Sequence, residues 1–116
     1  QGLPLWDLFY FLRSYCAEVA RSEQIYDRME AFTAIFLGSS ALRPFIVDAV
    51  RRYVERVGLP AATVEPLFFT CWMHRALKEA TLLDARKVDR GHYVSILRLC
   101  REQRDTPLLR QLFSGL

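Results

Sequence analysis

Asp7 is the first residue of this 116-residue chain whose type and position could do chemistry. It is the one carboxylate within the apolar run at residues 5–12. A buried carboxylate without a partner costs several kcal/mol, so a buried Asp7 must face a hydrogen-bond donor or shift its pKa. Two interpretations follow. Asp7 reaches out of this chain to brace the backbone amides of a catalytic loop, or it caps or pairs locally or is exposed.

A second candidate is the run Trp72-Met73-His74-Arg75. Aromatic and basic groups together can line a pocket for a polar or anionic small molecule. The alternative is that Trp72 belongs to the core and that His74 and Arg75 lie at its rim. His92, which follows a glycine, is interpreted as the first residue of a helix and has no assigned role.

Three widely separated cysteines, Cys16, Cys71 and Cys100, form no C-x-x-C pair for zinc and suggest no disulfide framework. We expect buried free thiols in a reducing compartment. The alternative is a catalytic pair of a cysteine with His74 or His92.

The motifs of a catalytic domain do not occur in the sequence. The five glycines stand singly, so there is no phosphate-binding glycine-rich loop. The sequence also contains no nucleophile elbow, no H-E-x-x-H pattern and no acidic cluster for magnesium. We therefore predict no catalytic residue, no metal site and no cofactor within this chain.

The charge pattern offers a third kind of chemistry. The net charge is +3, from sixteen basic and thirteen acidic residues. Arg98, Arg101 and Arg104 recur at helical spacing with Glu102 among them, which is typical of a nucleic-acid-binding stripe or of a solvated helix face. The second interpretation is favoured because no groove-reading motif or aromatic stacking platform accompanies the charges. We expect no nucleic-acid partner.

Helices must position all of these residues. Apolar residues make up 52% of the chain, and no segment alternates with the period of a strand. The sequence predicts one all-α domain over residues 1–116, a compact bundle of about five or six helices. The expected helices cover residues 5–21, 22–36, 41–57, 63 or 65 to 83, 92–102 and 106–113, with a polar connection at 84–91.

The expected helices differ in how their apolar residues are arranged. The first is apolar on every side, which is typical of an element buried all round. The second has Ser22 as its predicted N-cap. The third is the most clearly amphipathic, with one apolar stripe (Leu42, Phe45, Ile46, Ala49, Val50, Tyr53, Val54 and Val57), and Gly58 caps it. The fourth is the expected central helix. No apolar run approaches the ~20 residues of a membrane span, and the opening segment lacks the basic n-region and small-residue cleavage site of a signal peptide, so we expect a cytoplasmic protein.

The segment GLPLWDL at residues 2–8 resembles the G-x-P-x-x-D-L segment of the aminoglycoside phosphotransferase and choline kinase-like family. Further along, Tyr53, Gly58, Leu59 and Pro60 and the tryptophan-containing helix at 72–83 are similar to the C-terminal helical subdomain of these kinases. The resemblance implies that the chain is a C-terminal fragment of a larger phosphotransferase-like protein and that its missing partner is the N-terminal catalytic portion.

The resemblance also implies roles for named residues. Asp7 matches the aspartate that buttresses the catalytic loop, and Trp72, His74 and Arg75 become candidates for the wall of the acceptor site. The family's H-x-D-x-x-x-x-N loop and metal-binding aspartate lie upstream of this segment, so Mg²⁺ and ATP are implied for the parent protein only. The fragment is expected to be inactive alone and to self-associate through the helix from Leu5 to Leu12. The acceptor stays open among aminoglycosides, choline, homoserine and sugars.

The rival hypothesis is a freestanding α-helical module for ligand binding or protein interaction. In that case the first helix is central to a closed core, and Asp7 is satisfied internally. A DNA-binding regulator ranks last because the sequence has no helix-turn-helix signature.

Overall fold

The computed structural model describes residues 3–37, 42–82 and 91–114. These residues form six α-helices, one π-helical segment and one short 3-10 helix, without a β-strand among them. The elements are α1 (Trp6–Ser22), α2 (Arg28–Ala31), η1 (Phe32–Leu37, the π-helical segment), α3 (Arg43–Val57), η2 (Ala61–Thr63), α4 (Val64–Ala80), α5 (His92–Glu102) and α6 (Pro107–Ser114). The predicted all-α bundle is confirmed. Of the predicted connection at 84–91, residues 84–90 lie outside the described residues.

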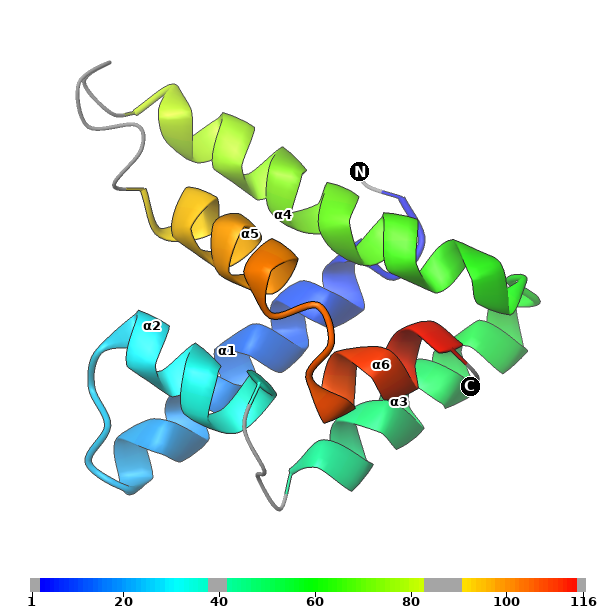
Figure 1. Ribbon diagram of the computed structural model, residues 1–116, viewed down its shortest axis with the longest axis horizontal. Coiled ribbons are helices and arrows are strands. Elements are labelled where there is room, and N and C mark those ends of the chain that lie inside the picture. The colour runs from blue at the N-terminus through cyan, green and yellow to red at the C-terminus, as the bar shows by residue number, and fades with distance from the viewer. Residues whose placement is uncertain (1–2, 38–41, 83–90, 115–116) are drawn as a thin grey trace.

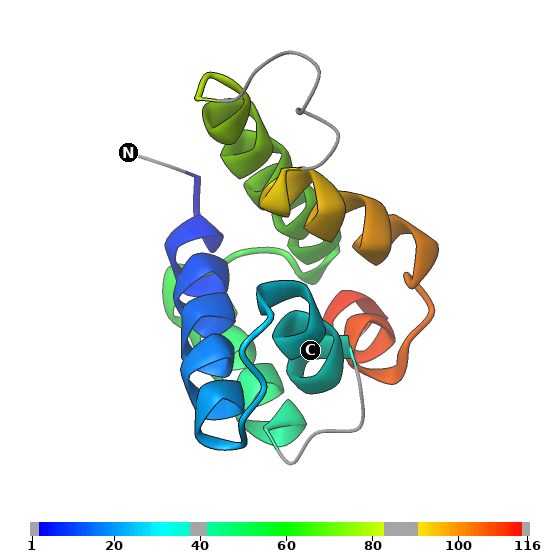
Figure 2. The same ribbon diagram turned by 90° about the vertical axis from the view of Figure 1, so that its left-hand side faces the viewer.

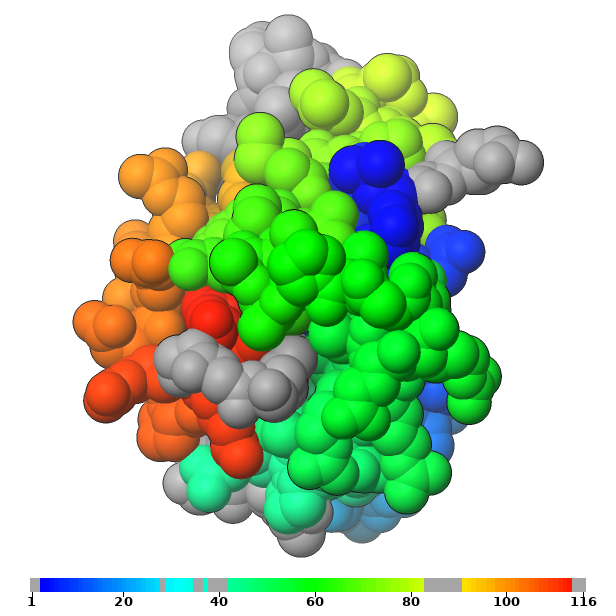
Figure 3. All heavy atoms as spheres, turned by 90° about the vertical axis from the view of Figure 1, so that its right-hand side faces the viewer, coloured from blue at the N-terminus to red at the C-terminus, as the bar shows by residue number. Residues whose placement is uncertain are grey.

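The helices pack around one shared hydrophobic core. α4 and α5 lie side by side and antiparallel (Figure 1), and α1 packs against α4. Side chains of α1 also reach the start of α5, where Tyr10 meets Tyr93 and Arg13 meets His92 (Figures 1 and 2 show the arrangement of the three helices). α2 and η1 pack against α1, whereas α6 packs against α3 and α4. The start of α1 lies beside α4, as Figure 3 shows from the other side. This crossing places residues from α1, α4 and α5 next to one another.

The buried face of α1 follows helical spacing. Its buried residues are Phe9, Leu12, Cys16 and Ala20, three or four positions apart, and Leu5 just before the helix is also buried. These side chains meet an aromatic core that α4 supplies. The Phe9 and Phe68 rings meet edge to face with centroids 5.1 Å apart, and Phe68 in turn contacts Trp72 at 5.8 Å. α4 is the central buried helix, as the sequence predicted.

The prediction that α1 is buried all round is wrong. Asp7 is exposed, and the side chains of Phe11 and Tyr15 are 56% and 40% exposed. The neighbouring elements leave one side of α1 exposed, whereas Trp6, Leu8 and Tyr10 are partly buried. The apolar stripe of α3 is also broken, because Phe45 at its start is 46% exposed.

One of the two predicted helix caps is confirmed and the other is wrong. Gly58 ends α3 in the left-handed conformation at φ 79°, where a glycine costs least. The predicted N-cap at Ser22 is wrong, because Ser22 ends α1 and its hydroxyl donates to the Val19 carbonyl. Asp27 caps α2 instead, with its carboxylate accepting from the Glu30 amide at 2.8 Å.

Candidate functional site

Asp7 lies in the first turn of α1, where the helix dipole favours a carboxylate. Its side chain is exposed, and no hydrogen bond or ion pair joins it to another described residue. Of the alternatives for Asp7, exposure is what the structure has, and within the described residues Asp7 neither caps nor pairs locally. Its carboxylate is available to a group outside it.

An exposed face of α1 continues from Asp7. Asp7, Phe11 and Tyr15 recur every four residues and form what we call the α1 stripe. The Phe11 and Tyr15 rings stack with centroids 6.1 Å apart, and Tyr15 contacts Phe45 of α3 at 5.5 Å. The result is an aromatic surface patch with a carboxylate at one end.

The three residues predicted to line a pocket have different surroundings. Trp72 is 0% exposed and lies within the core, and its buried indole N–H has no hydrogen-bond partner in the described structure. His74 is half-buried and stacks on Trp6 with ring centroids 4.6 Å apart. Arg75 is half-buried and lies over the Tyr10 ring. The latter two face α1, so the three do not converge on one point.

A second set of polar side chains gathers where α1, α4 and α5 meet. We call Tyr10, Arg13, Arg75, His92 and Tyr93 the Arg–Tyr cluster. The Arg75 Cζ lies 3.6 Å from the Tyr10 centroid, and the Arg13 Cζ lies 5.2 Å from Tyr10 and 5.4 Å from Tyr93. These distances are typical of cation–π contacts. Two cations thus lie close to one phenol ring.

Arg13 is held in place by its other contacts. Its Nη1 lies 3.0 Å from His92 Nε2, and its Nη2 donates weakly to the Ser14 hydroxyl at 3.4 Å. Because an arginine can only donate, His92 Nε2 must accept, which places the ring proton of this buried histidine on Nδ1. The Arg13 Nε is buried without an acceptor among the described residues. A donor left in this state costs about 1–3 kcal/mol.

The start of α5 is fixed from α4. The Glu79 carboxylate accepts a hydrogen bond from the Tyr93 backbone amide at 2.9 Å. This contact satisfies one of the free amides of the first turn of α5. On the other side of Tyr93, the Trp72 ring stacks at 6.2 Å between centroids. Tyr93 is therefore positioned by its backbone and by its ring.

The pKa values of the two tyrosines of the cluster are shifted in opposite directions. The hydrogen bond from Tyr93 lowers the pKa of Tyr10 most, and the Arg13 and Arg75 charges lower it further. Burial raises the pKa of Tyr93 to about 12, and its hydrogen bond to Tyr10 acts in the same direction. Tyr10 is thus the hydroxyl of the pair that more readily carries negative charge.

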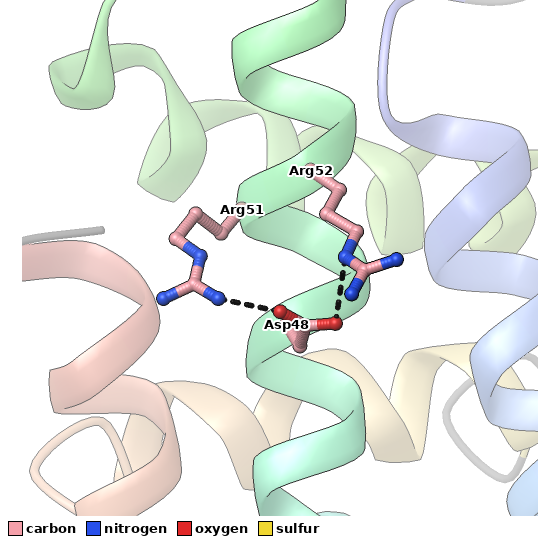
Figure 4. Close-up of polar contacts among 3 residues, drawn as sticks. All are labelled: Asp48, Arg51 and Arg52. Atoms are coloured by element: carbon pink, nitrogen blue, oxygen red, sulfur yellow. Dashed lines mark hydrogen bonds and ion pairs between the residues drawn. The ribbon is translucent and has the colours of Figure 1, made fainter.

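The cluster contrasts with the surface arginines. Asp48 binds Arg51 at 2.5 Å and Arg52 at 2.9 Å, with all three on α3 (Figure 4). Arg104 pairs with Glu65 at 2.5 Å. Arg13 and Arg75 form no ion pair within the described ranges. Two exposed hollows of about 440 and 430 Å³ lie elsewhere, one along α5 at Val94, Leu97, Arg98, Arg101 and Glu102, the other between α3 and α6.

The cysteines are unsuited to nucleophilic catalysis. Cys16, Cys71 and Cys100 are free and buried. Burial raises the pKa of each thiol to about 12, so each stays protonated at neutral pH. In the described residues, no three His, Cys, Asp or Glu side chains come together as metal ligands. Nor is any helix in these ranges both long and apolar enough to cross a membrane.

Sequence reasoning missed three members of the cluster, namely Tyr10, Arg13 and Tyr93. A local signal existed for two of them. Tyr10 and Arg13 are three residues apart and therefore share a helix face. Most of the residues just before Arg13 are apolar, so the pair does not stand out in the sequence. His92 was noticed for its place after Gly91, but its partner lies 79 residues away.

No protein-family model, no curated protein and no solved structure matches this chain. The resemblance at residues 2–8 therefore rests on the sequence alone.

Proposed function

We propose that the chain is the C-terminal helical subdomain of an ATP-dependent small-molecule phosphotransferase of the aminoglycoside phosphotransferase and choline kinase-like type. In this role it supports the catalytic loop through Asp7 and walls the acceptor site, and it is inactive alone. The observation that carries the proposal is the exposed Asp7, which has no partner among the described residues and begins the α1 stripe.

The surface around Asp7 suits a second body of protein. Phe11 is 56% exposed, and with Tyr15 and Phe45 it forms a patch of three aromatic rings. Burying such a patch stabilises a complex by about 25 cal/mol per Å² of apolar surface. The carboxylate at the end of the patch would then reach backbone amides of the covering segment, which are the donors that a catalytic loop offers.

The chemistry of phosphoryl transfer would come from that second body. Such a reaction needs a base that positions the acceptor hydroxyl and Mg²⁺ to neutralise the phosphate charge. The described residues hold no group suited to Mg²⁺, so no catalytic step is assigned to them. Their contribution is support for the loop and, through His74 and Arg75, part of the acceptor wall.

The first test is the open reading frame upstream of Gln1. We expect it to encode a His-x-Asp-x-x-x-x-Asn pattern, followed by an aspartate that lies just before residue 1. A start codon at this position would instead favour the freestanding module. In the same way, calorimetry should detect no Mg-ATP binding to the 116-residue chain, and micromolar affinity would overturn the proposal.

The second test uses the longer protein that includes the upstream segment. Asp7→Ala should lower its phosphotransferase activity at least tenfold, because the loop loses its brace, while the free energy of unfolding of the 116-residue chain changes by less than about 0.5 kcal/mol. Glu18→Ala, at another exposed carboxylate of α1, is the matched control and should leave activity unchanged. Light scattering of the short chain should show self-association through the α1 stripe.

The alternative function is a freestanding helical module that binds a small ligand. The Arg–Tyr cluster favours it, because the two arginines and the tyrosine pair lie together without any residue from outside the chain. Under this alternative, the Asp7→Ala change has no effect on function.

A further inference from the structure

Like charges stand close together in the Arg–Tyr cluster. The Cζ atoms of Arg13 and Arg75 lie 5.2 and 3.6 Å from the centroid of the Tyr10 ring, and both residues are half-buried. Two cations beside one ring repel each other, and the repulsion is stronger where water is partly excluded. An anion that contacts both guanidinium groups would offset this repulsion.

Among the described residues, the carboxylates near the cluster are engaged elsewhere or turned outward. Glu79, one turn after Arg75 on α4, accepts from the Tyr93 amide. Asp7, one turn before Tyr10 on α1, is exposed. Neither forms an ion pair with the two arginines. On α3, in contrast, the single carboxylate of Asp48 forms ion pairs with both Arg51 and Arg52.

Donors remain for a ligand. Arg75 makes no hydrogen bond to any described residue, so the five N–H groups of its guanidinium are unused by this part of the chain. Arg13 is held by His92 and Ser14, which orients its charge in advance. The Tyr10 ring lies 6.4 Å from the Tyr93 ring between centroids, and the Tyr10 hydroxyl can donate one hydrogen bond to a ligand.

We propose that Arg75, Arg13 and the Tyr10 hydroxyl form a binding site for one small oxyanion, a carboxylate or phosphate group carried by a small molecule. The planar fork of a guanidinium matches the two oxygens of such a group. The half-buried Arg75 provides the contacts, and Arg13 adds a second charge that His92 keeps in place. The site goes beyond the proposed function, since it needs no residue from an upstream segment.

The test is a titration of the 116-residue chain with inorganic phosphate and, separately, with acetate, at constant ionic strength set by chloride. Backbone amide NMR shifts and calorimetry give the affinity. We expect one saturable site with Kd on the order of 1 mM and shifts centred on the start of α5 and on the turns of Tyr10 and Arg75. Tighter binding of phosphate identifies a phosphate group as the ligand chemistry, and tighter binding of acetate identifies a carboxylate.

Variants assign the binding to the cluster. Arg75→Gln should weaken the phosphate affinity about tenfold or more, because it removes a charged donor pair, and circular dichroism should show an unchanged helix content. Arg51→Gln removes an exposed arginine of α3 and should leave the affinity unchanged. Tyr10→Phe keeps the ring and should weaken binding by a smaller factor.

Two results would overturn the site: no saturation up to about 50 mM phosphate, or equal affinity in the wild type and Arg75→Gln. Both are independent of the reading-frame and Mg-ATP tests. Failure of the oxyanion site therefore leaves the phosphotransferase hypothesis standing, and the reverse also holds.

Discussion

Arginines occupy two contrasting regions of this molecule. On α3, Arg51 and Arg52 lie on the surface and share the Asp48 carboxylate of the preceding turn. Where α1, α4 and α5 meet, Arg13 and Arg75 contact phenol rings and, for Arg13, an imidazole from a distant helix. The surface ion pairs form within one helix, whereas the cluster requires three helices to pack. The contacts of the arginines on α3 thus depend on neighbours in the sequence, whereas those of the cluster arginines depend on the packing of three helices.

The largest effect is expected from a substitution in the core that supports the cluster. Trp72→Ala should lower the free energy of unfolding by about 3–5 kcal/mol, because the buried Trp72 ring contacts Phe68 and stacks against Tyr93. Urea denaturation measures the change. Leu77→Ala, at an exposed position of the same helix, should cost less than about 0.5 kcal/mol. Similar losses in the two variants would contradict the placement of Trp72.

A direct comparison of the two regions uses one substitution in each. Arg13→Met should lower the free energy of unfolding by about 1 kcal/mol, because the lost His92 and cation–π contacts outweigh the removal of the unpaired Arg13 Nε. Arg52→Met on the α3 surface should cost no more than about 0.5 kcal/mol. Added salt should reduce only the second effect. Equal costs at all salt concentrations would remove the distinction between the regions.

Alkaline titration sharpens the description of the cluster. The pKa of Tyr93 is raised to about 12, so the stability that its neutral form provides is complete below its ordinary pKa of 10.0 and is lost as the pH rises to about 12. The three thiols act in the same direction from 9.0 to about 12. Chemical denaturation should therefore show the free energy of unfolding falling over this window.

The tyrosinate absorbance of the folded chain provides the matching readout. One of the five tyrosines should ionise below the ordinary range, since the pKa of Tyr10 is lowered. Another should ionise only near pH 12, and Tyr93→Phe should abolish that step. A single transition at the ordinary tyrosine pKa would show that the two hydroxyls do not interact.

The smallest expected effect belongs to the α3 surface. Asp48→Asn removes the carboxylate that both arginines share, yet exposed ion pairs contribute only about 0.2–1 kcal/mol. Urea denaturation at low and high salt should show a small loss that disappears as salt is added. A loss that persists at high salt would mean that these ion pairs resemble the cluster more than a solvated surface.

Local patterns were sufficient to predict most of the fold. The bounds of α5 (His92–Glu102) match the prediction, and Gly58 ends α3 as expected, because both depend on residues within a few positions. α1 differs, since its apolar residues occur on every side and only the packing of its neighbours decides which face is buried. For that reason the exposure of Phe11 could not be predicted from the sequence.

The candidate site was predictable only in part. Arg75 was identified as a polar residue on the central helix, but its contact with Tyr10 depends on how α1 crosses α4. The Asp7 carboxylate was noticed because it interrupts an apolar run, yet its exposure depends on the same crossing. Pairs such as Arg13 with His92 have no signature in a single sequence, because no local pattern links positions 79 residues apart.

The contact between Arg13 and His92 also bears on the order of folding. Because these residues are separated by 79 positions, their meeting closes a long loop, and such closures carry an entropic cost that local helix contacts do not. α1 and the α4–α5 pair contain mainly local contacts, but the cluster can assemble only when α1 packs against α4 and α5. Kinetically, then, the Arg–Tyr cluster should be among the last parts of the molecule to reach its native arrangement.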